Sequence, residues 1–276
     1  ASDSHTLLGW DALHQQYVAY CRPSVHEGNM VRRIGRAVSA DFVHWTDPEE
    51  ILVPDAQDPE GLQFYNMPVF KYEGLYIGQL ATYHTAPEEP HIRFYGTIDI
   101  QLAASRDGIA WERVGERRPF IPNGPPNSID AGEVYLANAP LVMDDELWFY
   151  YSPCPVEHGP TGRSGPICLA KLRLDGFVSV DADDALGTLV TQPFRCAGGA
   201  LQINAAARKG LVAVAVLDEE GIQYKGFGRA DCALFDSDSV RHEVTWRQVA
   251  FAALQGQVIR LKFYLRNAHL YSFVQG

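Results

Sequence analysis

Several polar side chains of the kinds used in acid–base chemistry gather around the most aromatic stretch of the chain. Asp130, Glu133 and Tyr135 precede an apolar run that spans residues 147–151, and His158 follows that run. Cleavage of a glycosidic bond needs two carboxyl groups, one acting as an acid and one as a base or nucleophile. Two carboxylates close to a tyrosine and a histidine are therefore a candidate set for acid–base chemistry of this kind.

Glu133 is the best candidate for the acid, because it lies between a glycine and an apolar valine, and apolar surroundings raise the pKa of a carboxyl group. Asp130 would act as a base, stabilise the transition state, or hold a substrate hydroxyl. His158 would orient a carboxylate or hydrogen-bond a sugar, and Tyr135 would contact the substrate. The alternative is that both carboxylates are solvated groups at a strand end and that His158 is a surface-loop residue without a role.

The elements that must position these residues form a repeat of short strands. A hairpin pattern followed by further strands occurs over 7–53, again over 67–122 and a third time over 139–178. The segments 37–45 and 103–111 share Ala, Ser, Asp and Trp at matching positions. Copies at roughly sixty to seventy residues, each with about four short strands, are typical of β-propeller blades. A β-sandwich of unrelated hairpins is the alternative, which the shared motif disfavours.

The residues that recur in every copy are expected to be structural. Asp41, Asp107 and Asp175 occupy the same turn of each copy, which is typical of turn chemistry and not of catalysis. The tryptophans that end the two matched segments are expected to anchor the packing of the blades. Asp99 interrupts a β-branched strand, and we favour a buried structural acceptor over a residue of the site.

The pattern changes after residue 194. Residues 195–276 show short strands at close spacing without the blade motif, which predicts a small antiparallel β-sandwich. The boundary is expected near 192–199. The sequence therefore predicts an all-β protein with two domains, a β-propeller part over 1–194 and a C-terminal β-sandwich over 195–276.

The segments 39–45, 105–111, 145–151 and 174–179 carry recurring Ser, Asp, Gly and aromatic positions. Together with the C-terminal strands around 238–265, they resemble proteins related to glycoside hydrolase families 32 and 43. The closest likeness is to a bacterial group with a family 32 N-terminal-like domain, and it extends over nearly the whole chain. The resemblance implies a five-bladed propeller followed by a sandwich, with a sugar site in a funnel lined by the first strand of each blade.

In such a propeller, two further inner strands would begin near residues 3–5 and 65–67. Asp3 stands at the blade start where family 32 places its acid, so Asp3 and Glu133 compete for that role, and Asp130 completes the acidic set. The residues expected to bind the substrate are His5, Tyr65, Asn66, Tyr135 and His158.

The chain departs from the family pattern in its number of blades. Three blades are recognisable where the family has five, and the Asn-Asp-Pro-Asn and Arg-Asp-Pro runs of family 32 do not occur. Asp58-Pro59 lacks the arginine and lies in a loop between two copies. Three blades of this type cannot close a five-bladed ring. We therefore expect that missing N-terminal blades, or another copy in a homo-oligomer, complete the propeller.

Composition limits the partners. The 276 residues carry a formal net charge of −11 without a basic patch, which argues against a nucleic-acid backbone as the partner. No apolar stretch approaches the roughly 18 residues of a membrane span. The five cysteines form no CxxC pair, which argues against a zinc site or a disulfide framework. We expect neither a metal nor a cofactor.

The sequence thus favours a carbohydrate-active protein that hydrolyses a glycosidic bond of an oligosaccharide or glycoside with paired carboxylates. The alternative is a glycan-binding or scaffold module with a degenerate or incomplete site. Both fit a soluble protein that stays in the cytoplasm or is exported after removal of a leader. The residues do not specify the sugar, the linkage or the stereochemical outcome.

Overall fold

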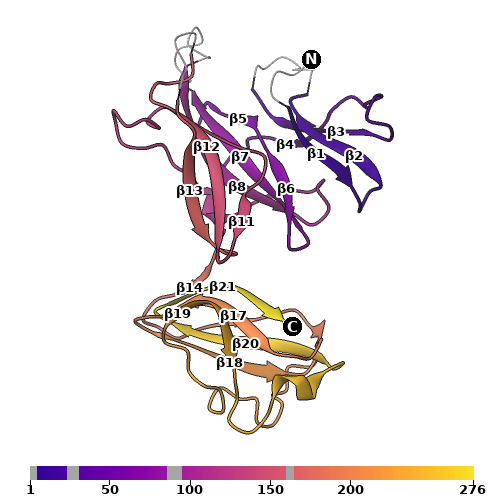
Figure 1. Cartoon of the computed structure of the whole chain (residues 1–276), viewed down its shortest axis with the longest axis vertical. Coiled ribbons are helices and arrows are strands. Elements are labelled where there is room, and N and C mark those ends of the chain that lie inside the picture. Colours follow the sequence, from indigo (N-terminus) through magenta and orange to yellow (C-terminus); the bar gives the residue numbers. More distant parts are fainter. Residues whose placement is uncertain (1–4, 24–30, 86–94, 160–164) are drawn as a thin grey trace. The chain divides into compact units, whose positions relative to one another are not determined.

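The computed structural model describes residues 5–23, 31–85, 95–159 and 165–276. The prediction of an all-β protein is confirmed, since regular structure in these stretches consists of strands and of two 3₁₀ turns, η2 (Gly115–Arg117) and η3 (Phe251–Leu254). None of their helical segments is long and apolar enough to cross a membrane. The chain divides into two compact units, the first with residues 1–143 and 147–171 and the second with 144–146 and 172–276 (Figure 1).

The first unit begins with a four-stranded antiparallel meander, called blade 1 below. Its strands, paired in chain order, are β1 (His5–Asp11), β2 (Gln16–Cys21), β3 (Ile34–Ser39) and β4 (Glu49–Leu52). Val18 and Tyr20 of β2 are buried, and they pack against Met67 and Tyr76 of the next sheet. Their spacing of two residues places both side chains on the same face of the strand.

The second sheet of this unit has nine strands and holds two further copies. Blade 2 consists of β5 (Leu62–Asn66), β6 (Val69–Tyr72), β7 (Leu75–Thr85), β8 (Gly96–Ser105) and β9 (Glu112–Arg113). Blade 3 consists of β10 (Glu133–Leu136), β11 (Leu141–Met143), β12 (Glu146–Cys154) and β13 (Cys168–Arg173). A parallel bridge between Glu133 and Ile98 joins β10 to β8 and so connects the two blades.

The predicted turn chemistry is present in the first two copies. The Asp41 carboxylate accepts hydrogen bonds from the backbone N–H groups of Val43 and His44. The Asp107 carboxylate accepts the equivalent pair from residues 109 and 110. In the third copy Asp175 has a positive φ of 55°, and its carboxylate instead accepts a hydrogen bond from the Ser272 hydroxyl.

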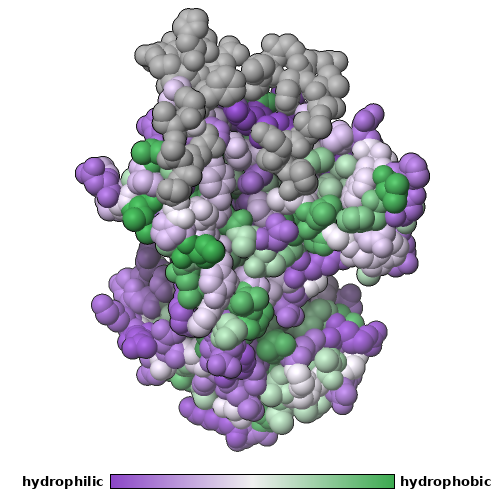
Figure 2. Space-filling view, turned by 45° about the horizontal axis from the view of Figure 1, so that its top comes forward, coloured by the Kyte–Doolittle hydropathy of each residue, from purple (hydrophilic) through white to green (hydrophobic). Residues whose placement is uncertain are grey.

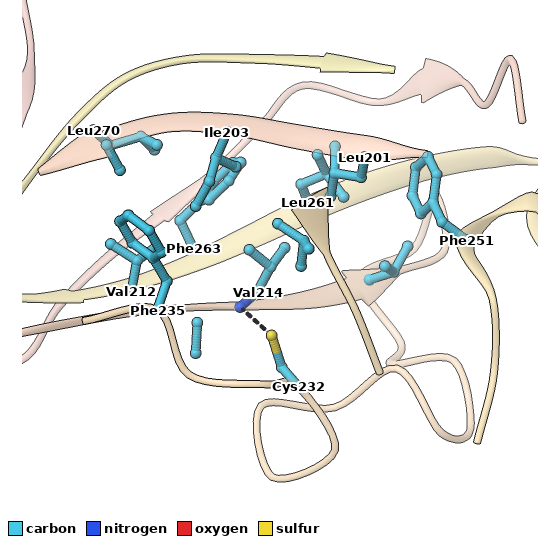
Figure 3. Packing of buried hydrophobic residues seen from close by; sticks show 14 of the residues in the cluster. Leu201, Ile203, Val212, Val214, Cys232, Phe235, Phe251, Leu261, Phe263 and Leu270 are labelled. Carbon is cyan, nitrogen blue, oxygen red and sulfur yellow. Dashed lines mark hydrogen bonds between the residues drawn. The ribbon is translucent and has the colours of Figure 1, made fainter. Parts of the chain in front are cut away.

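The second unit is a sandwich of two antiparallel sheets. One sheet has the order β14 (Val180–Ala182), β21 (Ala268–Gln275), β17 (Leu201–Ala206) and β19 (Asp238–Val244). In the other, β20 (Val258–Arg266) pairs with β15 (Gly187–Val190), β16 (Phe194–Arg195) and β18 (Leu211–Leu217). Along β20, Ile259, Leu261, Phe263 and Leu265 are buried and alternate with more exposed residues, as expected of a strand with one face in a core. Figure 3 shows Leu261 and Phe263 in this core.

The compact second unit starts earlier than the domain boundary expected near 192–199. Apart from residues 144–146, it consists of residues 172–276, which include β14 paired with β21 and β15 paired with β20. Residues 172–190 therefore contribute strands to the sandwich, although the repeat pattern assigns part of them to the third copy. The five-bladed closure expected from the family resemblance remains a prediction.

Candidate functional site

The centre of the candidate site is the carboxylate of Glu133, at the first position of β10. Its residue is fully buried, with an exposed fraction of 0%. Backbone pairing on both sides fixes its place, since Glu133 lies opposite Cys154 of β12 and Ile98 of β8. The preceding Gly132 permits this arrangement, because a Cβ atom there would collide with the backbone carbonyl of Val156.

Tyr135 and His158 bind the same oxygen of Glu133. The Tyr135 hydroxyl donates a hydrogen bond to Glu133 Oε2, and His158 Nδ1 lies 2.9 Å from that oxygen. Tyr135 is two residues from Glu133 along the strand, so both side chains point to one face of the sheet. The His158 backbone N–H donates to the Gly96 carbonyl at 2.8 Å, which ties the loop after β12 to blade 2. A buried carboxyl, a phenol and an imidazole in mutual contact can hold and pass a proton.

Two tyrosines of blade 2 form an aromatic wall around the histidine. The ring centroid of His158 lies 4.9 Å from that of Tyr65 on β5 and 5.1 Å from that of Tyr83 on β7. Tyr65 also packs edge-on against Tyr135 at 5.7 Å. Tyr83 is fully buried, so of the two tyrosines Tyr65 is the one that is partly exposed.

Two arginines lie over the same wall. The Arg32 guanidinium carbon is 5.0 Å from the Tyr83 ring centroid and 5.7 Å from that of Tyr65, and the Arg22 guanidinium carbon is 5.5 Å from that of Tyr65. Arg32 also donates to the side chain of Gln63 at 2.8 Å. Cations over aromatic rings are attracted by the ring quadrupole and bring positive charge to the wall.

The structure brings together four of the predicted site residues, Glu133, Tyr135, His158 and Tyr65. Asp130 instead lies in the loop before β10, where its carboxylate accepts a hydrogen bond from the Ser128 hydroxyl at 2.6 Å.

The other predicted residues are Asn66, His5 and Asp3. Asn66 is at the end of β5 and pairs with Ala81 beside a β-bulge. His5 is the first residue of β1, where its backbone pairs with Cys21. Asp3 lies outside the described residues.

Sequence reasoning missed Tyr83, Arg22 and Arg32. Tyr83 lies in the middle of a strand whose residues are nearly all buried, so it reads as a core residue. Arg22 and Arg32 lie between β2 and β3. The presence of two basic residues in this connection is the feature of the sequence that could have pointed to them. Their convergence depends on the packing of blade 1 on blade 2, which local pattern does not specify.

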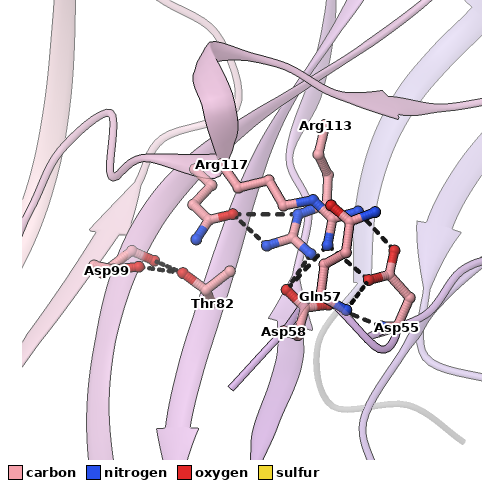
Figure 4. A network of polar contacts seen from close by, with 8 residues as sticks. Asp55, Gln57, Asp58, Thr82, Asp99, Arg113 and Arg117 are labelled. Carbon is pink, nitrogen blue, oxygen red and sulfur yellow. Dashed lines mark hydrogen bonds and ion pairs between the residues drawn. The ribbon is translucent and has the colours of Figure 1, made fainter.

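A second group of buried polar residues lies apart from Glu133. Asp99 accepts a hydrogen bond from the Thr82 hydroxyl across the β7–β8 pair (Figure 4). His84 Nε2 lies 3.2 Å from the same carboxylate. These contacts satisfy the Asp99 side chain within the sheet. They agree with the structural role expected for it from the sequence.

Two arginines, one at the end of β9 and one in η2, form ion pairs with the loop before β5. Arg113 pairs with Asp58, and Arg117 pairs with Asp55 and Asp58 (Figure 4). A hollow of about 580 Å³ lies beside this network and is lined by both arginines and Asp55. Because the charges of the two arginines and the two aspartates neutralise one another, we interpret the network as a structural connection between two loops.

No family model matches the chain, and no characterised protein matches it in sequence. Among solved structures, one described as a glycoside hydrolase is 17% identical, covers 59% of this chain and 47% of its own, and has a TM-score of 0.43. An N-acetylgalactosamine deacetylase from F. plautii, in complex with blood group B trisaccharide, is 13% identical over 95% of this chain and 49% of its own, with a TM-score of 0.41.

A family 32 β-fructofuranosidase variant from Bombyx mori, in complex with sucrose, is 8% identical over 98% of this chain and 90% of its own, with a TM-score of 0.40. The chain thus spans about half the length of the first two of these proteins. At such identities and TM-scores, the likeness does not assign a function.

Proposed function

We propose that the protein is carbohydrate-active and hydrolyses a glycosidic bond at the cluster of Glu133, Tyr135 and His158. The observation that carries the proposal is the fully buried carboxylate of Glu133, one oxygen of which contacts both a phenol and an imidazole beside a tyrosine wall. A carboxyl that serves as general acid needs surroundings of this kind, in which burial opposes its ionisation.

The partial exposure of Tyr135 suggests a route for the proton. Glu133 has no exposed surface, whereas Tyr135 is only partly buried and its hydroxyl contacts the carboxylate. In the proposed step Tyr135 gives its proton to the glycosidic oxygen while the C–O bond to the leaving group breaks, and it regains a proton from the protonated form of Glu133. A water molecule forms the new C–O bond to the sugar carbon and gives its proton to the base. Asp130 and Asp3 are proposed as the second carboxyl group, with Asp130 as the base.

Glycan binding without hydrolysis is the second candidate function. The complete burial of Glu133 favours it, because a carboxylate without exposed surface cannot touch a substrate in this arrangement. In that case the tyrosine wall and the neighbouring arginines would hold a glycan, and the Glu133 cluster would only order the wall.

The test compares Glu133→Gln with the wild type on a panel of aryl-glycosides and fructans. We expect the wild type to release product and the variant to lose about 10²- to 10⁴-fold in kcat, the usual contribution of a general acid. Asp99→Asn is the matched control, since Asp99 is also a buried carboxylate beside a histidine but lies outside the cluster. It should keep its rate within a few-fold.

The same panel separates the two candidates when calorimetric binding is measured alongside turnover. Oligosaccharide binding without product, equal in the wild type and Glu133→Gln, would support the binding module and contradict hydrolysis. A Glu133→Gln variant that hydrolyses at the full rate would exclude the proposed acid.

A further inference from the structure

A hollow in the first unit is lined by residues other than those of the Glu133 cluster. Its volume of about 580 Å³ falls within the range of ~300–1,000 Å³ that is usual for sites that bind small molecules. Leu52 and Val53, at the end of β4, contribute from blade 1, and residues at β9 and η2 contribute from blade 2. Asp55 and Gln57 add side chains from the loop between the blades. The hollow therefore depends on how blade 1 packs against blade 2.

One arginine of the lining is held rigidly. Arg113 pairs with Asp58, and both side chains are almost fully buried. The Arg113 guanidinium also donates to the side-chain oxygen of Gln101 on β8 at 2.5 Å. Partners on two other elements thus fix this guanidinium before any ligand enters. A group that is already ordered loses little conformational entropy when it binds.

The turn that brings Arg117 to the hollow has a strained backbone. Gly115, Glu116 and Arg117 have φ of 63°, 56° and 58°, so three consecutive residues are left-handed. This conformation is unfavourable for the two residues that carry side chains. Arg117 makes a forked contact with Asp55 at 2.7 and 2.6 Å, but both side chains are partly exposed, and exposed ion pairs contribute little. Backbone strain of this kind is concentrated at binding and active sites.

Charges of both signs line the hollow. The carboxylates of Asp55, Glu112 and Glu116 lie there together with the two arginines. Hydrogen bonds from Arg117 and from the Gln57 N–H lower the pKa of Asp55 below its ordinary value, so this carboxylate is ionised at neutral pH. The carboxylates would oppose an anionic ligand, and the guanidinium groups would oppose a cationic one. A neutral polar ligand meets neither opposition.

The polar groups of the lining match the hydroxyl groups of a sugar. A hydroxyl donates to a carboxylate and accepts from a guanidinium or an amide N–H, and hydrogen bonds to charged groups are the stronger ones. Within the part of the chain that the structure describes, the side chains of Gln57 and Glu112 make no hydrogen bond or ion pair (Figure 4 shows Gln57 beside Asp55). Both side chains are therefore available to a ligand.

Trp111 and Val53 add apolar surface to the lining. The Trp111 ring is fixed by an edge-on contact with Tyr20 at 5.7 Å, and Gly78 lets it pack close to β7, where a Cβ atom would lie 3.0 Å from the ring. Apolar residues reach the surface at several places on the visible face of the molecule, among hydrophilic ones (Figure 2). Exposure of Val53 alone therefore means little. Its position beside a fixed indole ring provides an apolar surface for the C–H groups of a sugar.

We propose that this hollow binds an uncharged sugar unit of a glycan, at a site additional to the Glu133 cluster. Trp111 contacts the C–H groups of the sugar ring, and Gln57, Glu112 and Arg117 bind its hydroxyl groups. The inference goes beyond the proposed function, because the hollow holds a glycan whether or not the Glu133 cluster cleaves one.

The test follows the indole N–H of Trp111 by NMR of nitrogen-15-labelled protein, in which Trp111→Phe identifies its signal among the five tryptophans. The probes are the methyl glycosides of glucose, galactose and mannose. We expect at least one of them to shift the signal in a saturable way. The uronic acid and the amino sugar of the same series should bind at least about tenfold more weakly, because each brings a charge next to a like charge.

Variants of the two available side chains locate the binding. Gln57→Ala and Glu112→Ala should each weaken it by about three- to tenfold, the usual loss for one hydrogen bond. Glu60→Ala is the matched control, since Glu60 is an exposed carboxylate of the same loop that does not line the hollow. Its affinity should equal that of the wild type. Glu133→Gln should also keep the affinity, which separates this site from the proposed hydrolysis.

Three results would overturn the inference. The first is the absence of a saturable Trp111 shift with all three neutral glycosides. The second is equal affinity in the wild type and in a Gln57→Ala, Glu112→Ala double variant that circular dichroism shows to be folded. The third is tighter binding of a charged sugar than of its neutral counterpart, since the two signs of charge in the lining would then not select an uncharged ligand.

Discussion

At the scale of single residues, Asp11, Asp99 and Glu133 are buried acidic residues of the first unit, and each has different partners. Asp11 contacts Lys71 and Tyr76, Asp99 contacts Thr82 and His84, and Glu133 contacts Tyr135 and His158. A buried carboxylate is tolerated only where donors replace its water. The Asp11 site includes the cationic amine of Lys71, which favours the ionised form of its carboxylate.

The pH dependence of stability should reveal Asp11. Burial alone would raise its pKa, but the hydrogen bonds from Lys71, Tyr76 and the Leu13 N–H, with the charge of Lys71, lower the pKa below its ordinary value. A group with a lowered folded pKa stabilises the fold above its unfolded pKa, and this contribution is lost as pH falls through the folded pKa.

Asp11→Asn should therefore lower the free energy of unfolding by about 1–3 kcal/mol at neutral pH. The loss should be smaller at the lowest pH at which the protein is still folded. Urea unfolding of both proteins at several pH values measures the difference. A deficit that is the same at every pH would contradict ionic stabilisation by Asp11.

At the scale of elements, the loops between blades are held by ion pairs whose burial differs. The Arg113 and Asp58 side chains are 4% and 3% exposed, whereas the Arg117 and Asp55 side chains are 24% and 47% exposed. Removing one partner of a buried pair leaves an uncompensated charge, and removing one partner of an exposed pair does not. The first pair should therefore decide whether the loop before β5 stays attached to β9.

Asp58→Ala should cost about 3 kcal/mol of unfolding free energy, because it leaves Arg113 buried without its counter-charge. Asp55→Ala is the matched variant in the same network and should cost much less. Denaturant unfolding of the two variants measures the contrast. Equal losses would show that burial does not govern the network.

Among the elements, the sequence predicted the turns and the strand-start residues of the site but not the contacts between distant segments. The Ser-x-Asp turns follow from local hydrogen bonding, so their recurrence predicted both the turns and the repeat. Glu133 and Tyr135 were predictable as strand-start residues that share a face. The arginines over the tyrosine wall were not, since they reach it from blade 1, and neither was the pairing of β14 and β15 with the sandwich strands, which only tertiary contacts decide.

At the scale of the whole molecule, the two compact units have separate cores. Leu80 is fully buried in the core between blades 1 and 2, and Phe263 is fully buried in the core of the sandwich. Separate cores allow separate cooperative unfolding, as is common for multidomain chains. The sandwich core is continuous across both of its sheets and does not draw on the blades.

Calorimetry should therefore resolve two unfolding transitions. Phe263→Ala should lower the unfolding free energy of the sandwich by about 3–5 kcal/mol, because it opens a cavity in that core. The unfolding transition of the first unit should stay unchanged. Leu80→Ala should have the reverse effect. A single transition that both variants shift equally would contradict independent units.

The long pairing of β7 with β8 has a consequence for the order of events in time. Its contacts run from the Thr85–Gly96 pair to the Tyr76–Ser105 pair, all within one stretch of chain, and such local contacts form early because little chain entropy is lost in closing them. β10, from a segment much later in the sequence, joins this hairpin through the bridge between Glu133 and Ile98. Glu133 therefore pairs with Ile98 only after the hairpin exists, and we expect the proposed site to mature at a late step of folding.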